Sequence, residues 1–246
     1  MNHDSLYVII PAYNESDTIT AVIDEWYKVV ENTNNNNSRL VVINDGSKDN
    51  TLQILQKAAT TRPQLTVLDK PNGGHGSTVL YGYEYALKHN ADFIFQTDSD
   101  GQTLASEFSQ LWNQRHNFDV QFGFRKKRED GAARWVVTKT LRMIIYSIFH
   151  TWVTDANTPY RLMRADVLRE AIKYVPLNYN LPNVILSVYF IKFHFKYRFV
   201  RITFRPRQGG VNSINIKSIS KIGTNALSDF YNIKKHIDRN EPYNEY

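Results

Sequence analysis

Asp98 and Asp100, near the middle of the chain, are the residues whose type and spacing best suit chemistry. They directly follow the apolar run 91–96, which is typical of a short buried strand. Side chains two residues apart can lie on the same side, and two carboxylates held so close repel each other unless a cation lies between them. Mg²⁺ or Mn²⁺ would fit there, since such ions bind one or two carboxylates plus substrate phosphates, and Gln102 offers a further oxygen. Acidic pairs beside a glycine are also common in caps and turns, so the rest of the chain must decide.

Strands and helices alternate around this pair. The expected strands cover residues 6–10, 40–43, 65–68 and 91–96, and the helices between them cover 17–30, 51–60 and 77–88. Such alternation predicts an α/β fold, with a mostly parallel sheet flanked by helices. Each strand runs into a polar or glycine-bearing turn. These turns share one edge of the sheet, where α/β proteins bind nucleotides.

One of these turns, residues 73–76, reads Gly-Gly-His-Gly and opens the third helix. Glycines let the backbone approach a phosphate closely, and a helix N-terminus favours an anion. The spacing matches neither GxGxxG nor GxxxxGK[ST], so we expect neither a Rossmann cofactor nor a P-loop. The alternative is a plain flexible loop.

The second half of the chain is richer in apolar and aromatic residues. Its expected strands cover 119–124 and 199–204, and its expected helices cover 135–153, 166–174, 184–195 and 216–233. For the helix at 184–195, the alternative is a helix that passes into a strand at Lys196. The helix at 135–153 has an apolar surface wider than one face, so it is either deeply packed or partly in lipid. The terminal helix is amphipathic and lysine-bearing, which suits a packed last helix or a basic helix on a membrane surface. We expect a single domain over residues 1–246.

The composition and charge of the chain limit the kinds of site and partner that it can have. The 246 residues are 42% hydrophobic and 22% charged, which is typical of a globular protein with a real core, and the absence of cysteine excludes disulfides and thiolate metal sites. The net charge of +6 favours anionic partners such as nucleotides or phospholipid surfaces. No nucleic acid is expected, because no recognition motif or long basic face is present. The chain begins without a signal-peptide pattern and has no apolar run near the roughly 20 residues that span a bilayer, so we expect a cytoplasmic protein, peripheral on the cytoplasmic face of a membrane.

Four motifs in order, PAYNE, NDGSKDNT, KPNGGHGS and DSDGQ, resemble those of family 2 glycosyltransferases with the GT-A fold. The branch of dolichol- or polyprenyl-phosphate mannose and glucose synthases is the most similar. The resemblance is strong over about the first 130 residues and continues more loosely to Ser213. It implies a metal-dependent, inverting hexosyltransferase whose donor is a UDP- or GDP-sugar. Residues 1–130 would then form the nucleotide-sugar half, and 131–246 the acceptor half with possible membrane-surface helices.

The resemblance also implies roles for individual residues on the donor side. The nucleotide-sugar pocket would be lined by Pro11, Tyr13, Glu15, Asp45, Lys70 and Asp98. Asp98, Asp100 and Gln102 would bind the metal and the donor diphosphate. Asp100 and Gln102 are the first choice for direct ligands, and Asp98 is also a candidate for holding the ribose or the sugar.

On the acceptor side the resemblance implies catalytic contacts from Arg125, Arg134 and Arg207 to phosphate groups, with Asp155 facing the acceptor. Arg161 would position the loop or a phosphate. A hydroxyl acceptor needs a base, for which Asp155 is the candidate. A lipid phosphate does not, because its second pKa near 6 leaves it largely ionised. We favour polyprenyl or dolichyl phosphate; the alternatives are a glycan or glycolipid hydroxyl and, in another class, a non-catalytic nucleotide- or membrane-binding protein.

Overall fold

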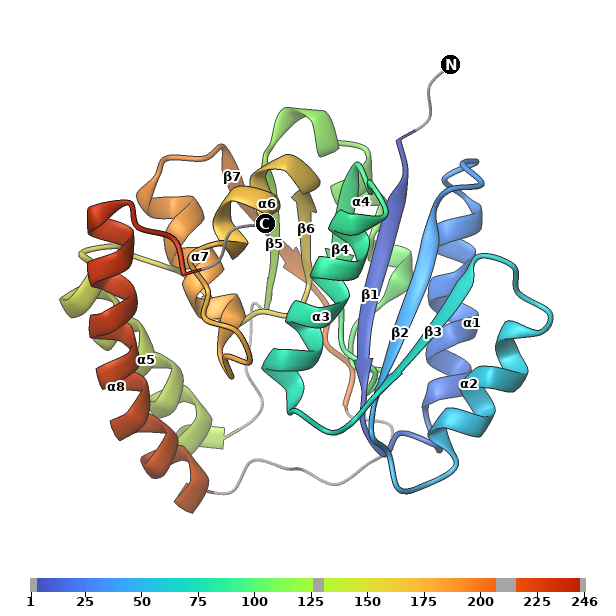
Figure 1. Cartoon of the computed structure of the whole chain (residues 1–246), viewed down its shortest axis with the longest axis horizontal. Coiled ribbons are helices and arrows are strands. Elements are labelled where there is room, and N and C mark those ends of the chain that lie inside the picture. The colour runs from blue at the N-terminus through green and yellow to red at the C-terminus, as the bar shows by residue number, and fades with distance from the viewer. Residues whose placement is uncertain (1–3, 126–130, 207–215, 244–246) are drawn as a thin grey trace.

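A seven-stranded sheet with the order β3-β2-β1-β4-β6-β5-β7 runs through the molecule (Figure 1). The computed structural model describes residues 4–125, 131–206 and 216–243, with the backbone alone for 125, 131–138 and 216–226. The strands are β1 Leu6–Ala12, β2 Arg39–Asp45, β3 Leu65–Lys70, β4 Phe93–Gln96, β5 Val120–Arg125, β6 Arg161–Arg164 and β7 Tyr197–Ile202. The helices are α1 Ile19–Glu31, α2 Thr51–Ala59, α3 His75–Lys88, α4 Ser109–Trp112, α5 Gly131–Phe149, α6 Ala165–Ile172, α7 Pro182–Lys192 and α8 Ile216–Arg239, and two short 3₁₀ turns cover Ala105–Glu107 and Arg115–Asn117.

The first four strands pair in parallel. β1 pairs with β2 and β4, and β2 pairs with β3. The predicted α/β class with a mostly parallel sheet is therefore confirmed. Strand β6 is not part of the prediction. It runs antiparallel to both β4 and β5, while β5 and the edge strand β7 are parallel.

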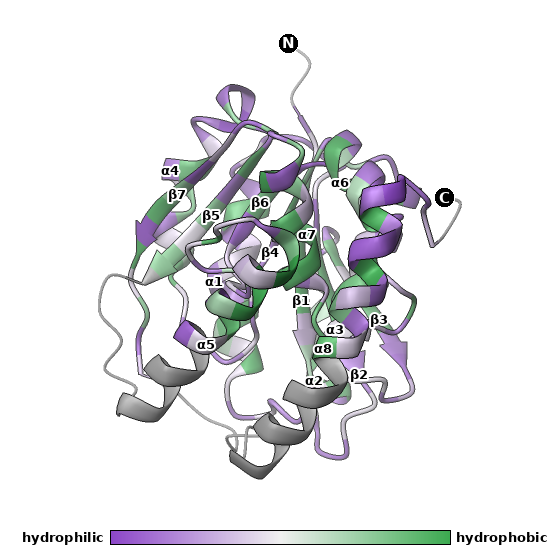
Figure 2. Ribbon diagram, turned by 90° about the vertical axis from the view of Figure 1, so that its left-hand side faces the viewer, coloured by the Kyte–Doolittle hydropathy of each residue, from purple (hydrophilic) through white to green (hydrophobic). Residues whose placement is uncertain are grey.

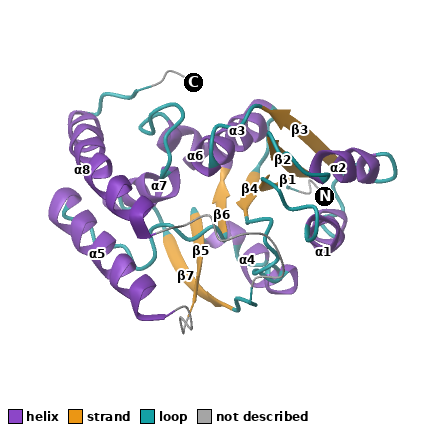
Figure 3. Cartoon of the chain, turned by 90° about the horizontal axis from the view of Figure 1, so that it is seen from below, coloured by secondary structure: helices purple, strands orange, loops and turns teal. Residues whose placement is uncertain are grey.

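Helices cover both faces of the sheet (Figure 3). Alternate residues of each strand point to opposite faces, so Ile9 and Val41 join the core under α3, α6 and α7, while Val8 and Val42 join the core under α1 and α2. The pair α5 and α8 lies side by side at one end of the molecule, joined by a contact between Phe149 and Phe230 with ring centroids 5.7 Å apart.

An aromatic cluster fixes the strand that leads to the aspartate pair. Phe95 of β4 has its ring centroid 4.7 Å from that of Tyr160, 4.8 Å from Phe108 and 5.1 Å from Trp26 on α1. Phe95 is fully buried. The cluster therefore joins β4, α1 and the segment before β6 into one packed unit close to the expected site.

Helix α7 is mostly apolar in sequence and almost wholly buried. Figure 2 colours the described residues by hydropathy. The described half of α8 shows both hydrophilic and hydrophobic positions in the same view, in agreement with the prediction of an amphipathic terminal helix. Within the described residues, no helix combines the length and the apolar composition that crossing a bilayer requires.

Several expected boundaries shift for local reasons. Helix α7 ends at Lys192 rather than at residue 195, because His194 takes a left-handed conformation with φ of 58°. Helix α5 ends at Phe149 rather than at 153, where His150 has φ of 54°. Helix α3 starts two residues earlier than expected, at His75, and α8 continues to Arg239.

We expect Phe95→Ala to lower the free energy of unfolding by about 3–5 kcal/mol, because a fully buried ring is removed and its three aromatic neighbours keep a cavity between them. Urea unfolding followed by circular dichroism measures this change. Phe193→Ala is the control, since that ring is 41% exposed at the end of α7. A loss below about 1 kcal/mol for Phe95→Ala would show that the cluster does not hold β4 in place.

Candidate active site

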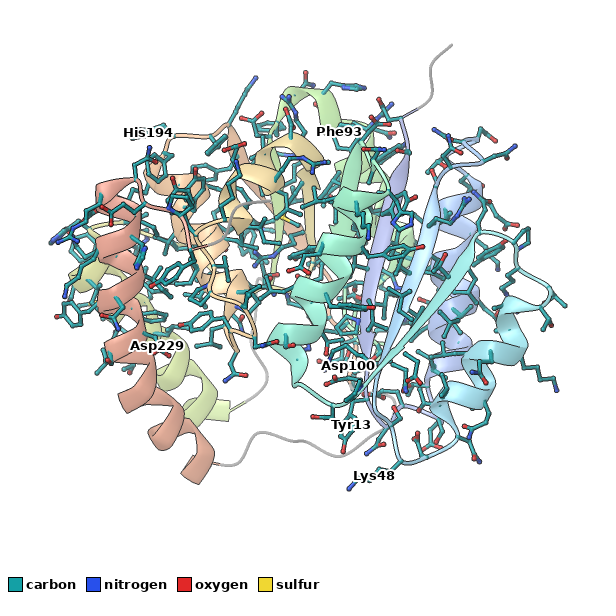
Figure 4. All side chains as sticks on the ribbon, viewed as in Figure 1. Tyr13, Lys48, Phe93, Asp100, His194 and Asp229 are labelled. Carbon is teal, nitrogen blue, oxygen red and sulfur yellow. The ribbon has the colours of Figure 1, made fainter. Side chains whose placement is uncertain are left out.

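The turns that follow β1, β2 and β4 meet at one edge of the sheet, as parallel strands require. Figure 4 shows Tyr13, Lys48 and Asp100 gathered at this lower edge, whereas Phe93, the first residue of β4, lies at the opposite end. Tyr13 is 43% exposed, while Pro11 is buried in β1. Three of the four sequence motifs therefore lie together at this edge: PAYNE, NDGSKDNT and DSDGQ.

The turn after β1 is tied to both neighbouring turns. Glu15 is buried, and its amide donates a hydrogen bond of 2.9 Å to the hydroxyl of Thr51 at the start of α2. The Thr18 hydroxyl lies 2.8 Å from Oε2 of Glu15 and 3.2 Å from the carbonyl oxygen of Ser99. Glu15 thus helps to fix the backbone between the two aspartates. Its predicted contact with a nucleotide stays a prediction.

Asp45, at the end of β2, binds the glycine turn after β3. Its carboxylate accepts a hydrogen bond of 2.6 Å from Nζ of Lys70 and hydrogen bonds of 2.9 and 3.0 Å from the amides of Gly73 and Gly74. Burial raises the pKa of Asp45, but the hydrogen bonds from Lys70 and Gly73 outweigh it, so the pKa lies below its usual value. The predicted neighbours Asp45 and Lys70 are therefore together, and contact with a base or ribose stays a prediction.

The glycine turn itself is shaped by backbone demands. Gly74 has φ of +86°, which side-chain-bearing residues rarely adopt. A Cβ on Gly76 would stand 2.3 Å from the carbonyl oxygen of Tyr179, so the start of α3 packs directly under the loop 176–181. Ser77 donates to Oδ1 of Asn178 at 3.2 Å. Sequence reasoning missed this loop, whose only signal is its cluster of asparagines between two prolines.

The aspartate pair, Asp98 and Asp100, lies beside the start of α3 and beside the segment that follows β7. Nε2 of His75 stands 3.8 Å from Oδ1 of Asp98. Oδ1 of Asp100 accepts from the amide of Gln102 at 3.1 Å, and Nε2 of Gln102 donates to the carbonyl of Arg205 at 3.3 Å. The amide of Arg205 donates back to the carbonyl of Gln102 at 2.7 Å.

The segment after β7 is thus anchored next to the aspartate pair by Gln102 and by Arg205, and the sequence analysis did not single out Arg205. Arg205 also forms an ion pair of 2.9 Å with Glu25 on α1. Arg207, the predicted diphosphate contact two residues further on, lies outside the described residues. Arg125 ends β5, and Arg134 lies in α5; for both the structure describes the backbone alone.

The residues at the edge fit a divalent cation that a diphosphate helps to hold. Two carboxylates and one amide oxygen come from the single segment 98–102. The described residues contain no group of three or more His, Cys, Asp or Glu placed to bind a metal alone. A hard cation with few protein ligands, completed by substrate phosphates, is the usual arrangement for Mg²⁺.

The loop before β6 carries the predicted acceptor residues. The neighbours of Asp155 are held from two sides: Arg142 on α5 donates to the carbonyl of Thr154, and the Ser187 hydroxyl on α7 donates to the carbonyl of Ala156 at 2.9 Å. Arg161 is fully buried, and its guanidinium donates to main-chain carbonyls. Arg161 therefore contacts the main chain of this loop, and its predicted role, to position the loop or a phosphate, stays a prediction.

The Glycosyl transferase family 2 model matches residues 7–172, which is more than half of the chain. The chain belongs to this family, and the predicted membership is confirmed. A dolichyl-phosphate beta-glucosyltransferase of Trichomonas vaginalis is 38% identical over 108 residues, covering 42% of this chain and 31% of that protein. An undecaprenyl-phosphate 4-deoxy-4-formamido-L-arabinose transferase of Pseudomonas fluorescens is 24% identical over 179 residues, covering 69% of this chain and 52% of that protein.

Both alignments thus span less than two-thirds of the relative's own length, and both relatives agree with the predicted lipid-phosphate branch. Among solved structures, glucosyl-3-phosphoglycerate synthase of Mycobacterium tuberculosis with Mn²⁺, UDP-glucose and phosphoglyceric acid superposes with a TM-score of 0.69. The superposition covers 94% of this chain and 80% of that one at 16% identity. It confirms the predicted GT-A fold.

Asp45 makes stability depend on pH in a defined direction. Because its pKa is lower in the folded protein, its contribution is fully present above the unfolded value near 3.9 and is lost as the pH falls through the lowered folded value. The difference in unfolding free energy between wild type and Asp45→Asn should therefore be largest near neutral pH and shrink below about pH 4. Urea unfolding at several pH values tests this. A difference that stays constant down to pH 2 would contradict it.

Proposed function

We propose that this chain transfers a hexose from a UDP- or GDP-sugar to a polyprenyl or dolichyl phosphate at a membrane surface. The observation that carries the proposal is the meeting of the aspartate pair, the glycine turn held by Asp45 and the loop of Asp155 around the carboxyl end of β4. The lipid-phosphate acceptor is supported by the names of the two relatives, and the UDP-sugar donor by the complex of the structural neighbour.

On the donor side, the turn at residues 73–76 offers a glycine backbone and the start of α3 to phosphate groups. Asp98, Asp100 and Gln102 would hold Mg²⁺ or Mn²⁺, which when bound neutralises charge on the diphosphate leaving group. Tyr13, exposed at the end of β1, would pack against the nucleoside. Arg125 and Arg207 would add positive charge where the diphosphate departs.

On the acceptor side, the nature of the nucleophile decides which residues act. A lipid phosphate is already ionised, so it needs cations such as Arg134 to match its charge rather than a base. A hydroxyl must lose a proton, which Asp155 would accept. In either case the family resemblance implies attack from the side opposite the diphosphate, and thus inversion at the anomeric carbon.

The membrane surface in this proposal is supported by an exposed ridge that we define as Met143, Tyr146 and Trp152. These side chains are 51%, 48% and 54% exposed, and the Tyr146 and Trp152 rings meet edge to face with centroids 5.9 Å apart. Tryptophan and tyrosine favour the membrane–water interface. Residues 139–153 contain Lys139, Arg142 and His150 but no acidic residue, which suits an anionic surface. The choice of the cytoplasmic face rests on the sequence alone.

We expect turnover to need a divalent metal and Asp100. Incubation with polyprenyl phosphate, Mg²⁺ or Mn²⁺ and a panel of UDP- and GDP-sugars, followed by mass spectrometry, should reveal one glycosylated lipid phosphate. Asp100→Asn should lower turnover by about 10²-fold or more, by analogy with losing a key charge-stabilising group. Asp24→Asn, an exposed aspartate on α1, is the control. Unchanged turnover in EDTA would rule out the metal.

The acceptor class can be read from Asp155→Asn. With a lipid phosphate, kcat/KM at saturating donor should fall by less than about tenfold, since no proton is removed by a base. With a hydroxyl acceptor the same substitution should cost roughly 10²–10⁴-fold, the usual range for a lost general base. The measurement is kcat/KM for both acceptor types with folding checked by circular dichroism. The larger loss with polyprenyl phosphate would count against our preferred acceptor chemistry.

We expect the ridge to bind anionic vesicles. Co-sedimentation with phosphatidylglycerol vesicles should decrease as salt rises, because surface attraction is screened. It should also weaken for Tyr146→Ala but not for Tyr81→Ala, the matched control, which removes a 41% exposed tyrosine from α3. If wild type and both variants stay in the supernatant at low salt, the ridge is not a membrane contact.

A further inference from the structure

Arg161, the first residue of β6, is a fully buried cation that donates hydrogen bonds to main-chain oxygens. Its Nε donates to the carbonyl of Thr158 at 3.0 Å, and its Nη1 donates to that of Asn183 at 3.1 Å. Its Nη2 donates to the carbonyls of Thr158 and Ala156 at 2.7 and 3.3 Å.

Such a group is costly to bury, so a fold that keeps it needs a compensating gain. Burial lowers the pKa of Arg161 to about 10, while the charges of Tyr83, Asp155 and Asp98 act against this shift. The guanidinium also lies 5.4 Å from the ring centre of Phe122. The two acids that balance the buried charge from a distance are therefore the predicted donor-side and acceptor-side acids.

The hydrogen bonds of Arg161 tie together two segments on the acceptor side. Ala156 and Thr158 belong to the loop that carries Asp155, and Asn183 lies in the first turn of α7. The same loop is held by the Thr158 hydroxyl, which donates to the carbonyl of Gly123 on β5 at 2.6 Å. A planar guanidinium with five donors is suited to hold several carbonyls at once, which a lysine ammonium cannot do in the same geometry.

Arg161 also lies next to the strand that leads to the predicted donor-side acids. In the antiparallel pairing of β4 with β6 it stands opposite Gln96, two residues before Asp98. The Gln96 side chain accepts a hydrogen bond from the buried hydroxyl of Tyr83, which also lies 3.4 Å from Oδ1 of Asn183. A buried polar network therefore runs from Gln96 on β4 through the Tyr83 hydroxyl to Asn183 on α7, and Arg161 joins it by donating to the Asn183 carbonyl.

We propose that Arg161 is a positioning residue that fixes the Asp155 loop against the strand of Asp98, and so sets the distance between acceptor and donor. The inference rests on the proposed function for its catalytic consequence, but not for its structural one. It assigns Arg161 no contact with either substrate. The reaction should then be sensitive to small displacements of the loop, since a shift of about 1 Å can cost on the order of 10²-fold in rate.

The first test uses Arg161→Lys, which keeps the charge and removes most of the carbonyl contacts. Hydrogen–deuterium exchange should become at least about tenfold faster over residues 154–160 while remaining near wild type over β2 and β3. Leu168→Ala, which leaves a cavity in the core on α6, is the matched control for general destabilisation. Unchanged exchange at 154–160, or equal acceleration in the Leu168→Ala control, would overturn the proposal. This readout needs no turnover, so it stands apart from any failure of the proposed function.

The second test separates positioning from loss of folded protein. In Arg161→Lys the KM for the lipid acceptor should rise and kcat should fall by about tenfold or more, while the Kd for the donor nucleotide stays within about threefold. A merely structural role would lower kcat through the folded fraction and leave both KM and Kd alone. In a double-mutant cycle with Asp155→Asn the losses should not add, since both act through one loop. Full additivity would contradict the proposal, whereas a wild type inactive with every acceptor would refute the proposed function alone.

Discussion

The antiparallel pairing of β4 with β6 is the constraint on which the proposed site depends. β4 ends at the aspartate pair, and β6 starts where the loop of Asp155 ends. Because the two strands run in opposite directions side by side, Arg161 lies opposite Gln96, and the carboxyl end of one strand meets the amino end of the other. A parallel neighbour would place that loop at the far end of the sheet, about four residues or some 13 Å away. In the proposed site, the donor-side and acceptor-side acids come to the same edge of the sheet through this reversal.

The structure uses buried polar contacts where an enzyme needs fixed backbone. Asp45 holds the glycine turn, Glu15 and Thr18 hold the turn beside Ser99, and Gln102 and Arg205 exchange hydrogen bonds across 103 residues of chain. Each contact joins turns that follow different strands. Satisfied buried polar groups rigidify and specify a structure, whereas unsatisfied ones cost stability. The edge of the sheet is therefore preorganised before any substrate arrives.

Sequence reasoning reached the parallel half of the fold because its signals are local. Apolar runs of four to six residues ending in polar turns predict β1 to β4, and the four motifs identify the family. The sequence analysis did not predict strand β6, because the strand has only four residues, Arg161–Arg164, and both of its end residues are arginines. No local pattern indicates that Arg161 is buried, since arginine is ordinarily exposed and only tertiary partners can offset its burial. The role of Arg205 depends in the same way on contacts with residues distant in sequence.

The central claim is that donor, metal and acceptor loop meet at the carboxyl end of β4. The most direct measurement is anomalous scattering from Mn²⁺ in a crystal grown with the donor nucleotide. Our account predicts one manganese peak in contact with Asp100 or Asp98, with the diphosphate facing the turn at Gly73 and Gly74. A nucleotide and metal bound at another edge of the sheet, with no density beside the aspartate pair, would contradict it.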